Sequence, residues 1–207
     1  MSTCGILPDY NKKKNKIKRR IFEFEEIWRK PDKRIFAELC FCICTPQSKA
    51  KKCWEAVSKL YETHMLFKGT SYEIALVLKR FGVRFYKTKA KRIVEARKYL
   101  PIKEKIKVMN LNWSREWLVK HIKGLGYKEA SHFLRNIGVG EKFAILDRHI
   151  MRNLIKFKVI EKLPKSMSPK IYIEIEQKMK QFANKNKIPL CELDLLFWSM
   201  ETGSIFK

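Results

Sequence analysis

Lys128 and Asp147 are the two residues of this chain whose types and spacing could do chemistry. Lys128 follows the glycine pair in Gly124-Leu125-Gly126, and Asp147 lies nineteen residues further on in Leu146-Asp147-Arg148-His149. A neutral lysine amine is a nucleophile, and a carboxylate can stabilise positive charge that develops beside it. The pair therefore indicates covalent catalysis with an electrostatic partner.

The glycine pair predicts a tight turn that can approach another molecule closely. Glycine has no Cβ, so the N–H groups of Gly124 and Gly126 can come near an anion such as a phosphate. Ser114 is a suitable N-cap for a helix ahead of the turn, and apolar residues recur at helical spacing behind it. Residues from about 114 to 137 are therefore expected to form helix, hairpin, helix.

Lys128 lies in the first turn of the second predicted helix, where the positive end of the helix dipole disfavours an ammonium group. With Ser131, His132 and Arg135 it forms the face opposite the apolar stripe, so we expect the lysine to point into a cleft or groove and not into the core. Two simpler interpretations remain open. Lysines of basic proteins are commonly solvated phosphate contacts, and Asp147 is a suitable N-cap for the helix that follows it.

The charge balance favours a polyanionic partner. The chain has 46 basic and 21 acidic residues among 207, a net charge of +25. Nucleic acid is the first candidate, and an anionic membrane surface is the second. No apolar run approaches the roughly 20 residues that a membrane-spanning helix needs. With no secretory signal in the sequence, we expect a soluble, cytoplasmic, DNA-associated protein.

Helical periodicity extends through most of the chain and predicts an all-α fold. The spacing is almost unbroken at Ala50, Cys53, Trp54, Val57, Leu60 and Tyr61. Prolines 46 and 101 interrupt the pattern. The basic run at residues 11–20 is typical of a mobile or solvated arm that adds phosphate affinity.

The hairpin, its lysine and the later aspartate resemble the helix-hairpin-helix DNA glycosylase superfamily. The segment 44–48 is similar to the superfamily's helix-ending turn with a DNA-facing glutamine, here Gln47, and 82–90 is similar to its glycine-to-Lys-Ala segment. The resemblance runs from about residue 35 to the end. The ending, 193–198 with a terminal Lys207, most resembles the type-2 8-oxoguanine DNA glycosylases of thermophilic archaea.

The resemblance implies two helical lobes with a DNA-binding cleft that holds the flipped base. It assigns residues 1–46 and 138–207 to a terminal lobe and residues 47–137 to a middle lobe with the helix-hairpin-helix. It also implies residue roles. Lys128 and Asp147 are the catalytic pair; Trp198, Lys207 and Phe85 recognise the base; Gln47, Gly124, Gly126, His132 and Arg148 contact DNA. A core position for Trp198 and an irrelevant C-terminus remain the alternative.

Cysteine spacing indicates buried thiols and not a metal site. The set Cys40, Cys42 and Cys44 lacks the paired spacing of a zinc site. Endonuclease III relatives hold an iron–sulfur cluster with four cysteines after the catalytic aspartate, whereas only Cys191 follows Asp147. We expect no metal, no iron–sulfur cluster and no other cofactor. A monovalent cation on the hairpin carbonyls is left open.

The leading hypothesis is a bifunctional enzyme that excises 8-oxoguanine from double-stranded DNA and cleaves the abasic site through a lysine Schiff base. One alternative is the same mechanism on another oxidised base. Another is a non-catalytic helix-hairpin-helix module that binds DNA. We expect a monomer whose partner is duplex DNA with an oxidised base, and no membrane association.

Overall fold

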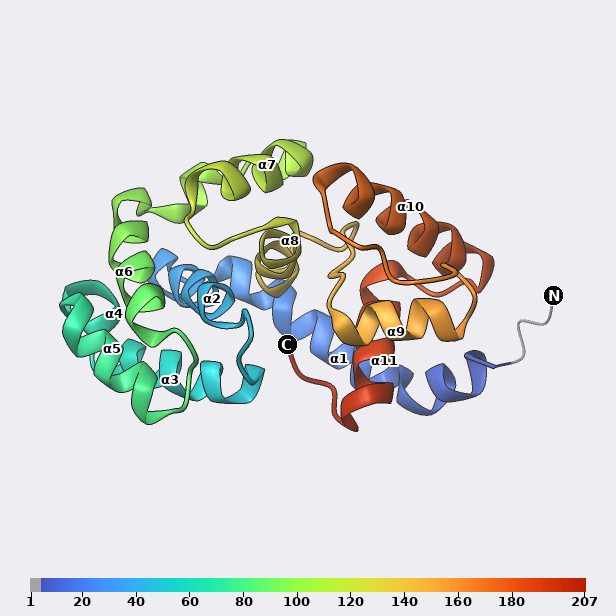
Figure 1. The fold of residues 1–207 in the computed structure, drawn as a ribbon, viewed down its shortest axis with the longest axis horizontal. Coiled ribbons are helices and arrows are strands. Elements are labelled where there is room, and N and C mark those ends of the chain that lie inside the picture. The colour runs from blue at the N-terminus through green and yellow to red at the C-terminus, as the bar shows by residue number, and fades with distance from the viewer. Residues whose placement is uncertain (1–4) are drawn as a thin grey trace. The chain divides into compact units, whose positions relative to one another are not determined.

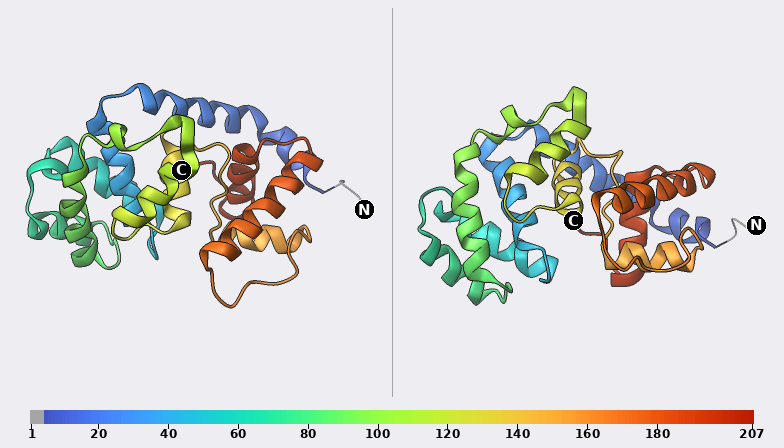
Figure 2. Two further views of the ribbon diagram at one scale, coloured as in Figure 1. Left: turned by 90° about the horizontal axis from the view of Figure 1, so that it is seen from above. Right: turned by 45° about the horizontal axis from the view of Figure 1, so that its top comes forward.

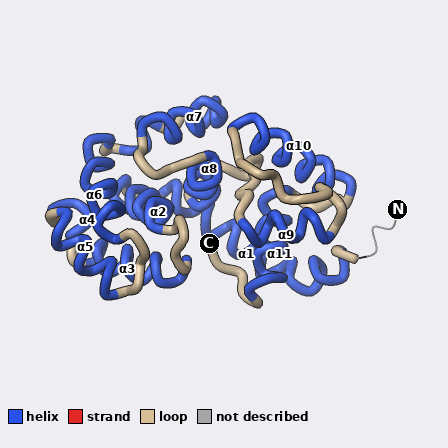
Figure 3. The backbone as a smooth tube through the Cα atoms, in the orientation of Figure 1, coloured by secondary structure: helices blue, strands red, loops and turns tan. Residues whose placement is uncertain are grey.

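The computed structural model describes residues 5–207, and every regular element in this part of the chain is helical (Figures 1 and 3). The all-α prediction is confirmed. The α-helices are α1 (Leu7–Arg29), α2 (Asp32–Cys44), α3 (Ala50–Glu62), α4 (Met65–Lys68), α5 (Ser71–Arg80), α6 (Tyr86–Ala96), α7 (Leu111–His121), α8 (Tyr127–Asn136), α9 (Arg148–Lys156), α10 (Pro169–Lys185) and α11 (Leu190–Thr202). Three 3-10 helices lie between α6 and α7: η1 (Arg97–Tyr99), η2 (Ile102–Lys105) and η3 (Val108–Asn110).

The chain divides into two compact units. Unit 1 comprises the described part of Met1–Glu26 together with Leu134–Lys207, and unit 2 is Ile27–Phe133. These boundaries differ from the lobes expected from the sequence, because residues 27–46 belong to unit 2. The reason is that α2 packs against α3 and α6 of that unit. The second boundary falls inside α8.

Helix α2 forms the centre of unit 2. Residues from Ile35 to Cys44 are buried throughout and almost all apolar, as expected of a helix surrounded by others. The exception is Glu38, which pairs with Arg34 at 2.9 Å. Cys40, Cys42 and Cys44 are buried free thiols, as predicted, and Cys53 of α3 is also buried. Burial raises the pKa of Cys53 to about 11, which keeps the thiol protonated.

Helix α11 has the corresponding place in unit 1, where it packs against α9 and α10. Its residues from Cys191 to Phe197 are buried. The Phe197 ring stacks on Phe157, with centroids 5.4 Å apart and planes 10° from parallel. Pro189 precedes the helix, as expected for a residue that has no N–H to donate.

The basic run at residues 11–20, predicted to be a mobile or solvated arm, is part of a helix, and within it only Ile17 is buried. These residues lie within α1, which the left view of Figure 2 shows as one continuous helix. Tyr10, Ile17 and Phe24 are buried and recur every seven residues, which is two helical turns. One apolar residue per two turns is enough to hold the helix against unit 1, while the intervening lysines remain at the surface.

Candidate functional site

The helix before the hairpin begins earlier in the chain than the sequence predicted. Helix α7 begins at Leu111, and the Asn110 side chain accepts a hydrogen bond from the Trp113 N–H at 3.1 Å. Ser114 is therefore not the N-cap. It is buried three residues inside the helix, where its hydroxyl accepts a hydrogen bond from the Lys107 N–H at 2.8 Å. Asparagine and serine are equally good caps, so sequence alone could not choose between them.

Gly124 is the hairpin position whose backbone requires glycine. Its φ of +93° lies in the left-handed region, and an added Cβ would lie 2.6 Å from Nη1 of Arg92 on α6. Gly126 has no such restriction, because an added Cβ there would lie at an ordinary 3.4 Å from the Glu129 carboxylate. Only the first glycine is thus explained by conformation.

Glu129 uses both carboxylate oxygens at the hairpin. Oε2 accepts a hydrogen bond from the Gly126 N–H at 3.2 Å, and Oε1 lies 2.8 Å from Nζ of Lys128. Gly126 is the N-cap of α8, since its carbonyl accepts the Ala130 N–H at 2.9 Å. A glutamate at the third helical position that bonds back to the cap is half of a capping box. The Gly126 amide expected to bind phosphate is therefore already engaged here.

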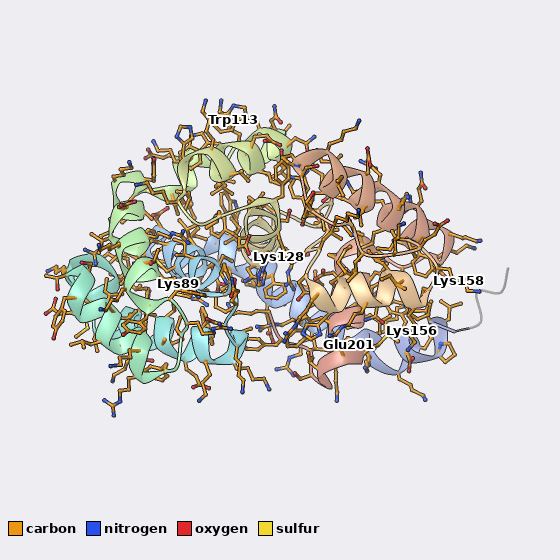
Figure 4. The ribbon with its side chains drawn as sticks, in the orientation of Figure 1. Lys89, Trp113, Lys128, Lys156, Lys158 and Glu201 are labelled. Atoms are coloured by element: carbon orange, nitrogen blue, oxygen red, sulfur yellow. The ribbon has the colours of Figure 1, made fainter. Side chains whose placement is uncertain are left out.

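Lys128 stays partly exposed, but its expected polar companions do not. The Lys128 side chain is 27% exposed at the first turn of α8 (Figure 4). Ser131, His132 and Arg135 are all buried. The His132 ring packs edge-on against Phe41 of α2, with centroids 5.4 Å apart. His132, expected on the polar face with Lys128 and as a DNA contact, is thus buried, because every residue of α8 from Ala130 to Asn136 is buried.

Gln47 and Phe85 share an unusual backbone conformation. Both have a φ of +56°, in the left-handed region that side chains seldom adopt, and both side chains are exposed. Strained, exposed residues cluster at binding sites, where surrounding contacts hold them in place. Both residues are among those expected from the sequence to contact DNA or the base, and their strained backbones require contacts that hold the turns around them.

The buried Lys89 of α6 is the centre of those contacts (Figure 4). Its Nζ donates to the carbonyls of Cys44 and Pro46, each at 2.7 Å, and to Oγ of Ser48 at 3.0 Å. The same serine oxygen accepts the Arg84 N–H at 3.0 Å. Burial lowers the pKa of Lys89, and the turns on both sides are fixed by one ammonium group.

Asp147 caps α9 with one oxygen and leaves the other open. Its Oδ1 accepts hydrogen bonds from the N–H groups of His149 at 2.8 Å and Ile150 at 2.9 Å. No described residue donates a hydrogen bond to Oδ2. The capping interpretation is therefore confirmed, and it is compatible with a catalytic role for the second oxygen.

Asp194 of α11 is a second carboxylate near Asp147. It is buried, and its Oδ2 lies 3.8 Å from Nη2 of Arg135. Burial raises the pKa of Asp194 to about 7; the Arg135 guanidinium opposes this shift and the Asp147 charge adds to it. The guanidinium of Arg135 also lies 4.6 Å from the ring of Phe24 on α1. Asp194 was not among the sequence-predicted site residues.

Trp198 and the C-terminal segment form an aromatic group in unit 1. The Trp198 ring lies 6.4 Å from the rings of His149 and Phe206. It is only partly buried, unlike the core residues before it in α11, and Lys207 is buried. Nε of Arg20 on α1 holds this segment by donating to the Phe206 carbonyl at 2.8 Å.

Arg148 lies at the first position of α9 and is exposed, as its expected contact with DNA requires. Its Nε donates to Nε2 of His149 at 3.3 Å. His149 in turn lies 3.8 Å from the Glu201 carboxylate, which also faces Arg152 at 3.6 Å.

A family model for 8-oxoguanine DNA glycosylase matches residues 17–188. The chain belongs to this glycosylase family. A curated 8-oxoguanine DNA glycosylase/AP lyase of Fusobacterium nucleatum is 45% identical over 206 residues, covering 96% of this chain and 94% of the relative. The family relatives are therefore bacterial as well as archaeal.

Two solved structures of 8-oxoguanine DNA glycosylases have the same fold as this chain. The Methanocaldococcus jannaschii 8-oxoguanine glycosylase/lyase, in complex with a 15mer DNA containing 8-oxoguanine, superposes with a TM-score of 0.92 at 37% identity, covering 98% of this chain and 97% of that chain. The Thermotoga maritima 8-oxoguanine DNA glycosylase gives a TM-score of 0.87 at 31% identity, covering 98% and 96%.

Two kinds of feature are absent from residues 5–207. Within that range, no three His, Cys, Asp or Glu side chains are grouped so that they could hold a metal ion. None of the helices in the same range is long and apolar enough to cross a membrane.

Four residues that were not identified from the sequence lie beside predicted ones: Lys89, Glu129, Arg20 and Asp194. A signal for Glu129 was present, because it stands three residues after the glycine N-cap. Lys89 stands four residues before the buried Ile93, so it interrupts an apolar stripe. Arg20 and Asp194 have no comparable local signal.

Proposed function

We propose that this chain excises 8-oxoguanine from duplex DNA and cleaves the resulting abasic site by β-elimination through Lys128. The observation that carries the proposal is Asp147, whose one oxygen caps α9 while the other has no partner among the described residues. The solved relative bound to DNA containing 8-oxoguanine supports the choice of lesion. A net charge of +25 supports binding to the DNA backbone.

The chemistry begins with extrusion of the damaged base, which costs a few kcal/mol. The bond between the base and the anomeric carbon breaks, and the base leaves with the bonding electrons and takes up a proton. The open oxygen of Asp147 stabilises the positive charge on the anomeric carbon. Nζ of Lys128 bonds to that carbon, the sugar ring opens, and loss of a proton gives the Schiff base. β-Elimination then removes a proton from C2′, beside the Schiff-base carbon, and breaks the C3′–O bond, so that the 3′ phosphate leaves with the bonding electrons.

The remaining predicted residues have roles in recognition. Gln47 fills the gap left by the extruded base. Trp198 and Phe85 offer flat surfaces for the base, since stacking on an aromatic ring contributes about 1–3 kcal/mol. Lys207 meets its polar edge, and Arg148 and the hairpin at Gly124 contact phosphates. A lysine nucleophile needs no metal or redox cofactor; a monovalent cation on the hairpin carbonyls would act on phosphate binding alone. We propose a monomer.

Borohydride trapping on DNA with 8-oxoguanine tests the role of Lys128. Lys128→Gln should lose the trapped complex, because borohydride reduces only a Schiff base. Lys123→Gln is the matched control: this hairpin lysine is 72% exposed and pairs with Glu95 at 3.1 Å. Equal trapping by both variants would refute Lys128 as the nucleophile.

Asp147→Asn tests the electrostatic role without removing the cap, because asparagine caps helices as well as aspartate does. Base release should slow by several hundred-fold, as on loss of one preorganised electrostatic group, about 3 kcal/mol. Affinity for the duplex should be nearly unchanged. A loss confined to affinity would contradict this role, and a panel of single-lesion duplexes would show whether another oxidised base is preferred.

A further inference from the structure

The segment of residues 143–146, which leads directly to Asp147, is buried but has no regular structure. Phe143, Ala144, Ile145 and Leu146 are each less than 9% exposed. Helix α9 begins only at Arg148. Backbone N–H and carbonyl groups that are buried outside helices must find other partners. The conformation of this segment therefore depends on side chains from elsewhere in unit 1.

Helix α10 supplies those partners from Tyr172 and Glu176. Oη of Tyr172 donates to the Ala144 carbonyl at 2.6 Å and accepts the Leu146 N–H at 3.2 Å. Oε2 of Glu176 accepts the Ala144 N–H at 2.9 Å. The two side chains are one helical turn apart, so they lie on the same face of α10. Both are almost completely buried, at 2% and 1% exposed.

We propose that Tyr172 and Glu176 are positioning residues that hold Asp147 in its productive place, an inference that rests on the proposed role of Asp147. The tyrosine hydroxyl bridges a carbonyl and an N–H on either side of Ile145, which prevents the segment from rotating. The N–H that bonds to this hydroxyl belongs to Leu146, the residue directly before Asp147. Neither side chain contacts the reacting atoms. Each acts through the backbone to which it is bonded.

The consequence for activity follows from the geometry that catalysis requires. A displacement of about 1 Å in a reacting group can lower the rate about a hundredfold, even when the mutation is remote. Loss of the Tyr172 hydroxyl leaves two buried backbone groups without that partner. The segment would then relax, and the open oxygen of Asp147 would move with it.

The test compares Tyr172→Phe with Tyr10→Phe. Tyr10 is a matched control, because its buried hydroxyl donates to Oε2 of Glu192 at 2.7 Å in the same unit. Both variants lose one buried hydroxyl, so a general loss of stability should affect both alike. In single-turnover assays we expect Tyr172→Phe to release 8-oxoguanine about 10- to 100-fold more slowly. Tyr10→Phe should stay within about twofold of the parent.

A double-mutant cycle with Asp147→Asn separates positioning from a structural effect. If Tyr172 acts through Asp147, its replacement in the Asp147→Asn background should slow base release little further. Fully multiplicative losses, or a Tyr172→Phe rate equal to that of Tyr10→Phe, would overturn the inference while leaving the proposed function intact. An Asp147→Asn enzyme with the parent rate would overturn both.

Glu176 supplies a second pair of variants in case Tyr172→Phe does not fold. Glu176→Gln keeps an oxygen that can accept the Ala144 N–H, whereas Glu176→Ala removes it. We expect the glutamine variant to retain most of the base-release rate and the alanine variant to lose it by at least about tenfold. Parent-like release by Glu176→Ala would overturn the inference.

Discussion

Two irregular segments lead to candidate site residues, the exposed Gln47 and the partly buried Asp147. A buried cation holds the first segment, and a buried carboxylate helps to hold the second. In unit 2, the turn with Gln47 is held by the ammonium of Lys89, which binds the carbonyls of Cys44 and Pro46. In unit 1, the segment before Asp147 is held chiefly by acceptors, including the Glu176 carboxylate on the Ala144 N–H.

The difference follows from which backbone groups each segment leaves without helical partners. The Gln47 turn comes after the C-terminus of α2, where carbonyls lack helical partners, so a cation satisfies them. The N–H groups at the N-terminus of α9 are satisfied by Asp147 itself, and the Glu176 carboxylate accepts the N–H of Ala144, in the irregular segment before that helix. The buried charge thus differs because the cation meets carbonyls in one segment and the carboxylate meets an N–H in the other.

Among substitutions, the comparison predicts the largest loss of stability for Lys89→Met, which removes the ammonium but keeps the apolar stem. The substitution removes three hydrogen bonds that the ammonium donates, including the one that the Pro46 carbonyl accepts. We expect the free energy of unfolding to fall by about 3 kcal/mol, as for a buried group left unsatisfied. Chemical denaturation measures it.

Lys91→Met is the control for that variant, because Lys91 is exposed on the same helix. Its stability should stay within about 0.5 kcal/mol of the parent. If the two variants were equally stable, the cation in unit 2 would not hold the turn, and the comparison between the segments would fail.

In unit 1, the buried carboxylate of Asp194 predicts that the stability of the protein depends on pH. Its pKa is raised to about 7 in the folded protein, chiefly by burial, against about 3.9 in the unfolded chain. Between these values the folded state binds more protons, so this group's contribution to stability is lost as pH rises from about 4 to 7. The loss should be about 4 kcal/mol, because each of about three pKa units corresponds to about 1.4 kcal/mol.

Thermal melts of the parent and Asp194→Asn at pH 5 and pH 7.5 measure that contribution. The asparagine variant cannot titrate, so its stability should change less between the two pH values. A pH dependence identical to the parent's would show that Asp194 is ionised throughout, paired with Arg135.

A smaller effect, on excision activity, is expected at Arg20, whose guanidinium donates to the Phe206 carbonyl near the C-terminus. Arg20→Ala removes the bond to the Phe206 carbonyl and the cation–π contact with Phe24 at 4.8 Å. Excision of 8-oxoguanine should fall about tenfold, the value of one charge-assisted hydrogen bond. Cleavage of a pre-formed abasic site should be retained, because it contains no base to recognise.

Arg19→Ala provides the matched control, since Arg19 is 84% exposed and only pairs with Glu23 at 3.5 Å. It should leave both activities unchanged. Equal loss of both activities in Arg20→Ala would indicate a general effect on unit 1 and not a hold on the C-terminal segment.

The smallest effect on stability is expected at the two hairpin glycines, where only Gly124 has a backbone conformation that requires glycine. Gly124→Ala places a Cβ at a φ of +93° and beside Arg92, and should destabilise the protein by about 1 kcal/mol. Gly126→Ala should change stability by only a few tenths of a kcal/mol, since its added Cβ has ordinary contacts. The reverse order in thermal melts would contradict this assignment.

Local features of both segments could be predicted from sequence. The Asp147 cap involves N–H groups two and three residues away, and the turn at Gln47 follows from Pro46. The groups that support these segments could not be predicted. Lys89 lies 41 to 45 residues from its partners, and Glu176 lies 32 residues from Ala144. No pattern within a helical turn connects such positions.

Mistaken expectations have the same origin. His132 and Lys128 share a helix face, and periodicity treats them alike, yet one is buried against Phe41 and the other is partly exposed. Likewise, residues 11–20 have the composition of a solvated arm, but burial of Ile17 makes them part of a packed helix.

The sequence by itself determined the helical class, the glycine hairpin with its lysine, the cap at Asp147 and a polyanionic partner. Each depends on total charge or on residues within about one helical turn of each other. Only the tertiary structure decided which polar residues are buried and which backbone groups Lys89, Tyr172 and Glu176 satisfy. Those outcomes depend on which helices pack together, because a buried polar group is stable only beside a partner that the fold brings to it.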